Sequence, residues 1–287
     1  MFRPYRLKNL LLVSMAGFAF YLSSVAQDPP QDSAECPKPS SWSYPSTNWG
    51  RDFPKCCSQI NPETKDIQQS PIDIVSSTEK TLTLALNYNG ADVPVEALDH
   101  TVEVVYHELS TAKQSRASES QPAAVENYVT YNGKKYWLLQ FHFHLPNEHE
   151  IKGKPVAKDM ENMEVHLVHQ ATDGGLLVIG VLINKGAANE AFGKILANVG
   201  GHANLNPVEM IPGAYNTSRL KFYTYTGSLT TPPCTPPVTW VVLKDPITIS
   251  STQLTSYEKL DNGKYEGTSR YPQPAITTLT VDSNFKP

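Results

Sequence analysis

The sequence predicts a mainly β fold of the α+β class, with a large, mostly antiparallel sheet and a few short helices. Three observations support this prediction. Seven short runs of alternating apolar residues are separated by Gly, Pro and Asn, which is typical of strands in an antiparallel sheet. Helical periodicity is confined to two segments. About 260 residues follow an N-terminal targeting segment, which is enough for one domain with a sizeable core.

The first 26 residues have the pattern of a secretory signal peptide. Arg3, Arg6 and Lys8 give a basic start, an apolar run covers Leu10–Val25, and small residues lead to a cleavage point near Ala26. The run of about 16 residues is shorter than the roughly 20 residues of a membrane-spanning helix. We therefore expect a cleaved signal (residues 1–26) rather than an uncleaved membrane anchor. The expected location is secreted and extracellular, or periplasmic in a bacterium.

The rest of the chain divides into a short leader and one domain. Residues 27–41 are rich in Pro, Ser, Gln and Asp and predict a loose leader, and residues 42–287 form the predicted domain. No second long apolar run follows, so we expect no stable membrane insertion. The net charge of −4 is mild, and no basic patch indicates a nucleic-acid partner. The oligomeric state is not predicted by any of these features.

The predicted elements lie along the whole domain. Strands are predicted over Thr81–Leu86, Thr101–Tyr106, Tyr136–His144, Met163–His169, Leu176–Ile183, Leu220–Tyr225 and Val238–Leu243. The strongest helical signal is Ala187–Val199, in which Phe192, Leu196 and Val199 have helical spacing. A second, short helix is predicted over Ser251–Lys259.

The sequence contains four cysteines, Cys36, Cys56, Cys57 and Cys234. None has a CxxC spacing, which argues against a thiolate zinc site, and an even number behind a signal peptide favours disulfides. Since adjacent cysteines rarely bridge each other, Cys56 and Cys57 are expected to take different partners, namely Cys36 and Cys234. Asn216 begins an Asn-Thr-Ser sequence and is a possible glycosylation acceptor in a eukaryote.

A His-x-His motif lies in the third predicted strand. Alternate side chains of a strand share a face, so Gln140, His142 and His144 face one way. The two phenylalanines between them face the other way, toward a core. The fourth predicted strand places Glu164 and His166 on one face in the same manner. If the two strands pair, His166 completes a three-histidine site.

Three neutral imidazoles are typical ligands of catalytic zinc. Three protein ligands leave the fourth coordination position open for water, and the double charge of the ion is left to acidify that water. Histidine ligands usually donate their second ring N–H to an acceptor. Gln140 and Glu164 lie on the ligand faces and are predicted to accept from His142 and His166. The sequence therefore predicts a Zn²⁺ site.

These motifs, in their order and spacing, resemble the α-class carbonic anhydrases of the secreted type over about Trp42–Pro274. The resemblance rests on Gln69–Ile74, Gln140–His144, Glu148–His149, Glu164–His169 and Gly227–Thr235. It implies a single domain with a twisted sheet and the zinc at the bottom of a cone-shaped cleft. It also implies a zinc lyase that reversibly hydrates carbon dioxide to bicarbonate and a proton through a zinc-bound hydroxide.

The resemblance implies roles for individual residues at the metal. His142, His144 and His166 match the zinc ligands. Thr230 matches the threonine that accepts the hydroxide's hydrogen bond, and Glu148 matches the carboxylate that accepts from that threonine. A hydroxyl that must donate to a carboxylate can only accept from the hydroxide, which aims the hydroxide lone pair at the substrate.

Further matches concern substrate binding and proton transfer. His100 matches a proton shuttle, since a histidine with a pKa near 6.5 can exchange protons with buffer. Tyr44 matches a residue of the proton-transfer water network. The Thr230 backbone N–H and Thr231 match polar contacts of the substrate. An apolar wall for carbon dioxide, which the residues alone would indicate as ordinary core, is matched by Val168, Val178, Leu229, Val238 and Trp240.

The resemblance also bears on the cysteines and on some departures. Cys234 matches a cysteine that secreted members pair with an N-terminal cysteine, which favours Cys57–Cys234 and leaves Cys36–Cys56 as the second pair. Residues 58–68 form a longer insert than is usual, so the pairing stays open. Leu98 and Glu103 replace polar residues that are common near the shuttle, with an expected effect on proton-transfer rate.

A second hypothesis is a non-catalytic extracellular matrix or binding module on the same fold. The expected sign of such a module is a broken zinc triad. Because His142, His144, His166, Thr230 and Glu148 are all present, we expect the enzyme.

Overall fold

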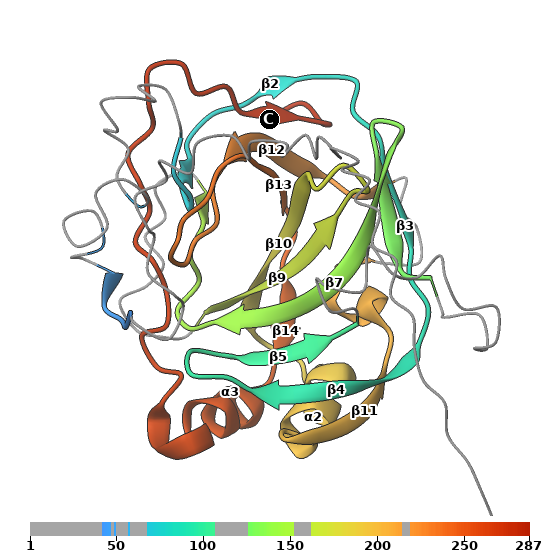
Figure 1. Cartoon of the computed structure of the whole chain (residues 1–287), viewed down its shortest axis with the longest axis vertical. Helices are drawn as coiled ribbons and strands as arrows, with labels where there is room; N and C mark the ends of the chain where they lie inside the picture. The colour runs from blue at the N-terminus through green and yellow to red at the C-terminus, as the bar shows by residue number, and fades with distance from the viewer. Residues whose placement is uncertain are drawn as a thin grey trace, which may run out of the picture. The chain divides into compact units, whose positions relative to one another are not determined.

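A long sheet runs through the described part of the chain (Figure 1). The computed structural model describes residues 42–46, 49, 57, 68–106, 126–151, 162–213 and 219–287. These residues all belong to one compact unit of the chain, Glu35–Pro287. Within them, thirteen strands form the large sheet, and β1 and β8 form a separate pair.

The strands are short except for three in the middle of the sheet. Their bounds are β1 Asp73–Ile74, β2 Thr78–Glu79, β3 Leu84–Asn87, β4 Ala91–Ala97, β5 Val102–Val105, β6 Tyr128–Tyr131, β7 Lys134–His144, β8 Glu150–Ile151, β9 Met163–Gln170, β10 Leu176–Lys185, β11 Gly201–Leu205, β12 Phe222–Gly227, β13 Val238–Leu243, β14 Ile247–Ile249 and β15 Asp282–Ser283. The helices are α2 Glu190–Ala197, α3 Ser251–Glu258 and the 3-10 helices η4 Pro207–Met210 and η6 Leu260–Gly263.

The strand order along the sheet is β11-β4-β5-β7-β9-β10-β13-β12-β15-β2. β14 pairs with β10, and β6 pairs with both β3 and β7. Most pairings are antiparallel, whereas β10 is parallel to β13 and β14, and β15 is parallel to β2. The predicted mainly β fold with a large, mostly antiparallel sheet and few helices is confirmed. β7, β9 and β10 lie side by side at its centre (Figure 1).

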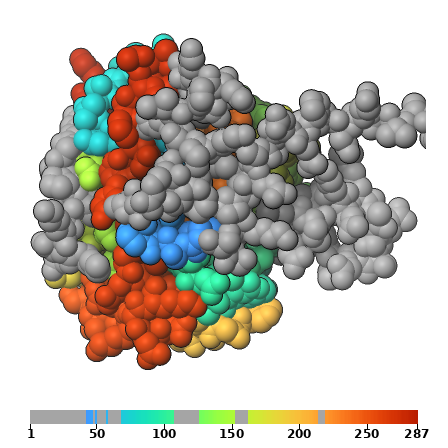
Figure 2. Space-filling model, turned by 60° about the vertical axis from the view of Figure 1, so that its left-hand side comes forward, coloured from blue at the N-terminus to red at the C-terminus, as the bar shows by residue number. Residues whose placement is uncertain are grey.

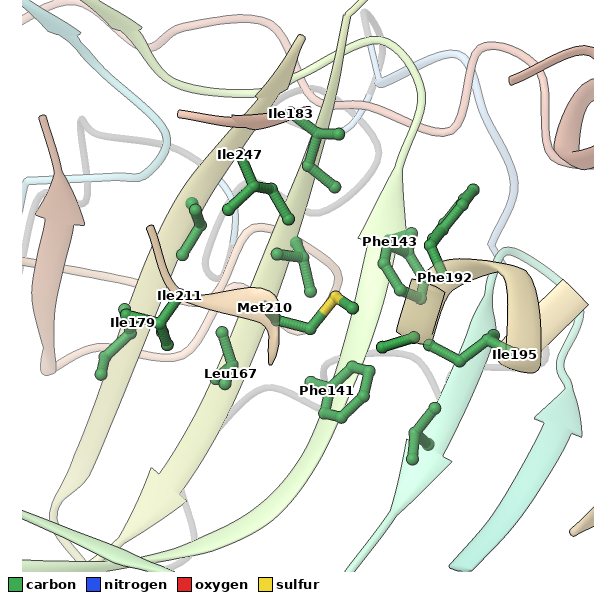
Figure 3. Close-up of a cluster of buried hydrophobic side chains, with 14 of the residues drawn as sticks. Phe141, Phe143, Leu167, Ile179, Ile183, Phe192, Ile195, Met210, Ile211 and Ile247 are labelled. Atoms are coloured by element: carbon green, nitrogen blue, oxygen red, sulfur yellow. The ribbon is translucent and has the colours of Figure 1, made fainter. Parts of the chain in front are cut away.

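One face of the central strands packs into the main hydrophobic core. Phe143 of β7 packs against Phe192 of α2, with ring centroids 5.1 Å apart, and Phe141 of β7 and Leu167 of β9 are buried in the same core (Figure 3). Burying an apolar side chain of this size contributes about 1.5–3 kcal/mol relative to leaving it in water. Because successive side chains of a strand alternate, the intervening residues of β7 and β9 must point to the opposite face.

A β-bulge in β7 changes this alternation. Leu138 lies opposite His169 of β9, whereas Gln140 lies opposite Val168, so Leu139 is one extra residue on β7. Leu138 and Leu139 are both buried. Beyond the bulge the alternation restarts with Gln140 directed away from the main core, which determines the face of every later residue in β7.

The two α-helices lie where the sequence predicts them. α2 is shorter than the predicted Ala187–Val199 because Asn189 is its N-cap: the Asn189 side chain accepts a hydrogen bond from the Phe192 N–H at 2.9 Å. α3 agrees with the predicted Ser251–Lys259 to within one residue. Six strands of the large sheet were not predicted from the sequence, namely β2, β4, β6, β11, β14 and β15.

A small aromatic cluster packs beside a disulfide at the start of the domain. Trp42, Tyr44 and Trp49 have ring centroids 5.1–5.6 Å apart, and Trp49 is buried with the Cys57–Cys234 disulfide. The predicted Cys57–Cys234 pairing is therefore confirmed. In Figure 2 the described residues of this segment (blue) lie against the C-terminal part of the chain (red).

Several predictions concern residues outside the described ranges. These are the signal peptide (1–26), the leader (27–41), the Cys36–Cys56 pair, Asn216 and residues 58–67 of the insert. Among the helices of the described ranges, none combines the length and apolar character needed to cross a membrane.

The disulfide is expected to stabilise the domain through the long loop that it closes. Cys57 and Cys234 are 177 residues apart, and a cross-link restricts the unfolded chain more as this separation grows. Replacing both cysteines by serine should lower the free energy of unfolding by about 2–5 kcal/mol. Denaturant unfolding of both proteins measures this difference, and an unchanged midpoint and slope would contradict the expectation.

Candidate metal centre

Two paired strands bring three histidines together. In the β7–β9 register His142 lies directly opposite His166, and His144 lies opposite Glu164. The ring centroids are 5.0 Å apart for His142 and His144, 5.5 Å for His142 and His166, and 4.6 Å for His144 and His166. One ligand nitrogen from each ring lies within 4.8 Å of the others. The predicted residues thus meet at one point on the sheet.

Two of these rings are each held by a hydrogen bond to a side chain on their own strand. Gln140 Oε1 lies 2.8 Å from His142 Nδ1, and Glu164 Oε1 lies 2.9 Å from His166 Nε2. Both oxygens are acceptors, so each of these ring nitrogens carries the proton. The opposite nitrogens, His142 Nε2 and His166 Nδ1, are left with a free lone pair.

The third ring is held by a backbone carbonyl far along the sequence. His144 Nδ1 donates to the Thr268 carbonyl oxygen at 2.8 Å, a partner that was not predicted from the sequence. His144 Nε2 is buried and has no hydrogen-bond partner among the described residues. A buried polar atom without a partner is costly in a folded protein. A metal ion on this nitrogen would remove that cost.

All three rings favour the neutral state. Burial holds the pKa of His142 well below its usual value and lowers that of His144 to about 4. Burial also lowers the pKa of His166, with Glu164 acting in the opposite direction. A neutral imidazole offers a lone pair to a metal, whereas an imidazolium does not. The donor set of three neutral nitrogens therefore fits Zn²⁺.

A second group of potential ligands shares one of these rings but is already satisfied. His149, Glu164 and His166 also have ligand atoms within 4.8 Å of one another. However, Glu164 Oε1 is 2.8 Å from His149 Nδ1, and Tyr225 Oη is 2.8 Å from His149 Nε2. Because these atoms already form hydrogen bonds with one another, the group supports His166 and is not available as a second metal site.

Glu164 is the most constrained residue of this support. Its Oε2 accepts from the backbone N–H groups of Glu148 at 2.9 Å and His149 at 2.7 Å. Burial acts to raise the pKa of Glu164, yet His149 and His166 together hold it well below the usual range. The carboxylate therefore stays ionised and fixes the orientation of the His166 ring.

A glycine leaves the space that Glu164 occupies. Gly180 of β10 lies opposite His166, and a Cβ built on Gly180 would lie 2.7 Å from Glu164 Oε1. This separation is shorter than real side-chain contacts. Any other residue at 180 would therefore displace the carboxylate from His166.

Glu148 and Thr230 lie beside the histidine cluster. Glu148 Oε1 accepts from the Arg270 backbone N–H at 2.7 Å, and Glu148 Oε2 lies 3.8 Å from His166 Nδ1. Burial raises the pKa of Glu148 to about 7, while His166 and the Thr230 hydroxyl act to lower it. The carboxylate thus faces the histidines, and it is close enough to the Thr230 hydroxyl for that group to lower its pKa.

His100 lies at the aromatic cluster rather than among the other histidines. Its ring stacks on Trp42 with a centroid distance of 3.9 Å and an interplanar angle of 29°, and Tyr44 lies edge-on at 5.8 Å. Burial lowers the pKa of His100, whereas Asp99 acts in the opposite direction. His100 is therefore neutral and partly accessible near pH 7.

A cavity of about 440 Å³ connects these groups. It is lined by Trp42, Tyr44, Leu98, Asp99, His100, Thr101, Glu103, Gln140, His142, His144 and Thr231. The five residues of the predicted apolar wall are not part of this lining. They lie together in a separate hydrophobic cluster, which Trp240 joins to the metal centre through a ring contact of 4.8 Å with His166.

Comparisons with known proteins agree with this fold and site. Residues 45–277 match the family model of the eukaryotic-type carbonic anhydrase. The carbonic anhydrase of Neisseria gonorrhoeae is 32% identical over 82% of this chain and 88% of its own, and that of Klebsiella pneumoniae is 31% identical over 85% and 91%.

Solved structures give the same result. The chain is similar to the α-carbonic anhydrase of Photobacterium profundum, with a TM-score of 0.62, 29% identity, and 84% of this chain and 99% of that chain covered. It is also similar to a hyperthermostable carbonic anhydrase from a hydrothermal vent chimney. Here the TM-score is 0.63 and the identity 30%, with 84% of this chain and 99% of that chain covered.

The fold and the matches place this chain in the eukaryotic-type, or α-class, carbonic anhydrase family. As a member it is a carbonate dehydratase, an enzyme that catalyses the hydration of carbon dioxide. Members of this family are generally zinc-dependent, and the histidine cluster is able to hold a metal ion.

Replacing Gly180 by alanine should weaken metal binding. The added methyl group would push Glu164 away from His166, and losing such a supporting contact typically costs about 10–100-fold in metal affinity. Chelator competition measures this affinity. Gly201→Ala is the matched control, because it lies in β11 of the same sheet and a Cβ there meets its nearest atom at an ordinary 3.4 Å. Equal affinities in the two variants would contradict this role of Gly180.

Proposed function

We propose that the chain hydrates carbon dioxide reversibly with a zinc ion held by His142, His144 and His166, and that His100 serves as its proton shuttle. The observation that carries this proposal is the convergence of three neutral ring nitrogens, of which the buried His144 Nε2 has no hydrogen-bond partner among the described residues. Gln140, Glu164 and the backbone carbonyl of Thr268 orient the three rings by accepting hydrogen bonds from the ring nitrogens on the side away from the cluster. When bound there, zinc lowers the pKa of a coordinated water to near neutrality, as is established for carbonic anhydrase, and supplies hydroxide.

Thr230 and Glu148 would orient the nucleophilic oxygen. Glu148 is buried and already accepts from the Arg270 N–H, so its remaining oxygen is available to accept from the Thr230 hydroxyl. A hydroxyl that donates to a carboxylate can only accept from the nucleophile. This arrangement would hold a lone pair toward the substrate carbon and reduces the orientational cost of the attack. Thr231 lines the cavity and offers a further polar contact.

The apolar cluster beside the metal centre would receive carbon dioxide. Val168, Val178, Leu229, Val238 and Trp240 belong to one cluster. An apolar surface suits an uncharged linear molecule and binds it weakly. Weak binding of this kind allows the charged product, bicarbonate, to leave through the cavity.

His100 would carry the proton between the metal centre and buffer. Its ring lines the same cavity as His142 and His144, so a chain of water molecules can link them. Its lowered pKa keeps the ring neutral near pH 7 and ready to accept a proton. Tyr44 lines the cavity next to His100 and would order the water between them.

We also propose an oxidising compartment, extracellular or periplasmic, for the folded protein. The support is the Cys57–Cys234 disulfide, since disulfides persist mainly outside the reducing cytosol.

Removing a ligand should abolish both metal binding and turnover. In His166→Ala one of the three nitrogens is lost, so metal analysis and stopped-flow hydration should both fall to background. The relative from Thermovibrio ammonificans is in complex with the inhibitor sulfanilamide, and sulfanilamide should inhibit this enzyme as well. His202→Ala is the matched control, because His202 is exposed on β11 and does not line the cavity. Full turnover by chelator-stripped or His166→Ala protein would refute the proposal.

Replacing His100 by alanine should slow turnover only where proton transfer limits it. In weak buffer we expect a loss of about tenfold or more, because His100 is the one histidine in the described cavity lining that is not a proposed metal ligand. Added imidazole should restore the rate by carrying the proton itself. The measurement is stopped-flow hydration at increasing buffer concentration, again with His202→Ala for comparison. Full activity of His100→Ala in weak buffer would remove His100 from this role.

A further inference from the structure

A carboxylate occupies the cavity wall next to the metal centre. Glu103 of β5 lies directly opposite His142 of β7 and directly opposite Glu96 of β4. Residues that lie opposite each other on neighbouring strands share a face. Glu96, Glu103, His142 and His166 therefore form one row across the sheet, and Glu103 lines the cavity together with His142.

The Glu103 carboxylate has no protein partner to balance its charge. Within the described residues it makes neither an ion pair nor a hydrogen bond, although it is only partly exposed to solvent. Burial raises its pKa to about 7, and Glu96 acts in the same direction. The other acid of the lining, Asp99, is exposed and lies 3.3 Å from the Lys264 ammonium group. The negative charge that faces the cavity without compensation is therefore that of Glu103.

The rest of the wall is suited to a small organic cation. Trp42 and Tyr44 line the same cavity as Glu103, and aromatic faces attract cations as carboxylates do. Of the two acids in the lining, Asp99 is paired with Lys264, so Glu103 is the one whose charge acts on a molecule in the cavity.

We propose that Glu103 determines which proton carriers the cavity accepts, favouring bases that become cations over bases that are anions. A neutral imidazole or amine takes a proton from the active-site water and becomes a cation beside the carboxylate, which stabilises it. A phosphate dianion would have to approach the same carboxylate and is repelled. This inference rests on the proposed function, because proton carriers matter only if hydration releases a proton in this cavity.

A permanently charged probe tests the cation preference without turnover. The 1,3-dimethylimidazolium ion has no free ring nitrogen, so it cannot bind the metal or carry a proton. Titration into the zinc-loaded protein at pH 8.5, where the carboxylate is ionised, should show binding that weakens about fivefold in Glu103→Gln. Glu96→Gln is the matched control, since Glu96 lies in the same row but does not line the cavity, and it should bind as the unmodified protein does.

A kinetic measurement tests whether Glu103 repels a proton acceptor that is an anion. In stopped-flow hydration at pH 8.5 with phosphate as the sole proton acceptor, Glu103→Gln should lower the half-saturating phosphate concentration about fivefold, and Glu96→Gln should leave it unchanged. Equal metal content and equal melting temperature establish that the variants are folded alike.

The outcomes separate the two proposals. Absence of any hydration by the unmodified, zinc-loaded protein would overturn the proposed function, while probe binding would still report on Glu103. Hydration with unchanged probe affinity and unchanged phosphate dependence in Glu103→Gln would overturn the role of Glu103 alone. Failure of the unmodified protein to bind the probe would do the same.

Discussion

The register between β7 and β9 is the constraint on which the metal centre depends. Side chains alternate along a strand, so a slip of one residue would move every side chain to the other face. In this sheet a slip would carry His142 and His144 into the core and Phe141 and Phe143 out of it. The burial of the two phenylalanines therefore stabilises the same register that assembles the three-histidine site with His166.

Next to this register, the buried charge of Glu164 has partners for both of its oxygens. Glu164 accepts from two backbone N–H groups and from two histidine rings, which offsets the cost of removing its carboxylate from water. Gly180 is small enough to leave room for it. The unpartnered nitrogen of His144 thereby lies at the point where a metal ion would bind, and the fold supplies the free energy that holds it there.

The fold class, the two α-helices of the described ranges and the three clustered histidines were predictable from the sequence because they depend on local alternation and on specific motifs. Three features were not predictable in this way. The bulge at Leu139 shifts the alternation of β7, and only the pairing with β9 reveals it. The apolar residues of β4 alternate, but Pro94 lacks a backbone N–H and argues against a strand, so only the pairing with β5 and β11 identifies it. The carbonyl of Thr268 carries no side-chain signal for its bond to His144.

The contacts of Thr268 and Arg270 tie the site to a segment that is distant in the sequence. Thr268 supplies the acceptor for His144, 124 residues away, and the Arg270 N–H holds Glu148, while the Arg270 guanidinium donates to the carbonyl of Cys57 at 2.8 Å. The His144 ring is therefore oriented only when this segment has docked on the strand that carries the ring. Assembly of the three-histidine cluster is accordingly coupled to long-range folding of the domain and is not a local property of β7 and β9.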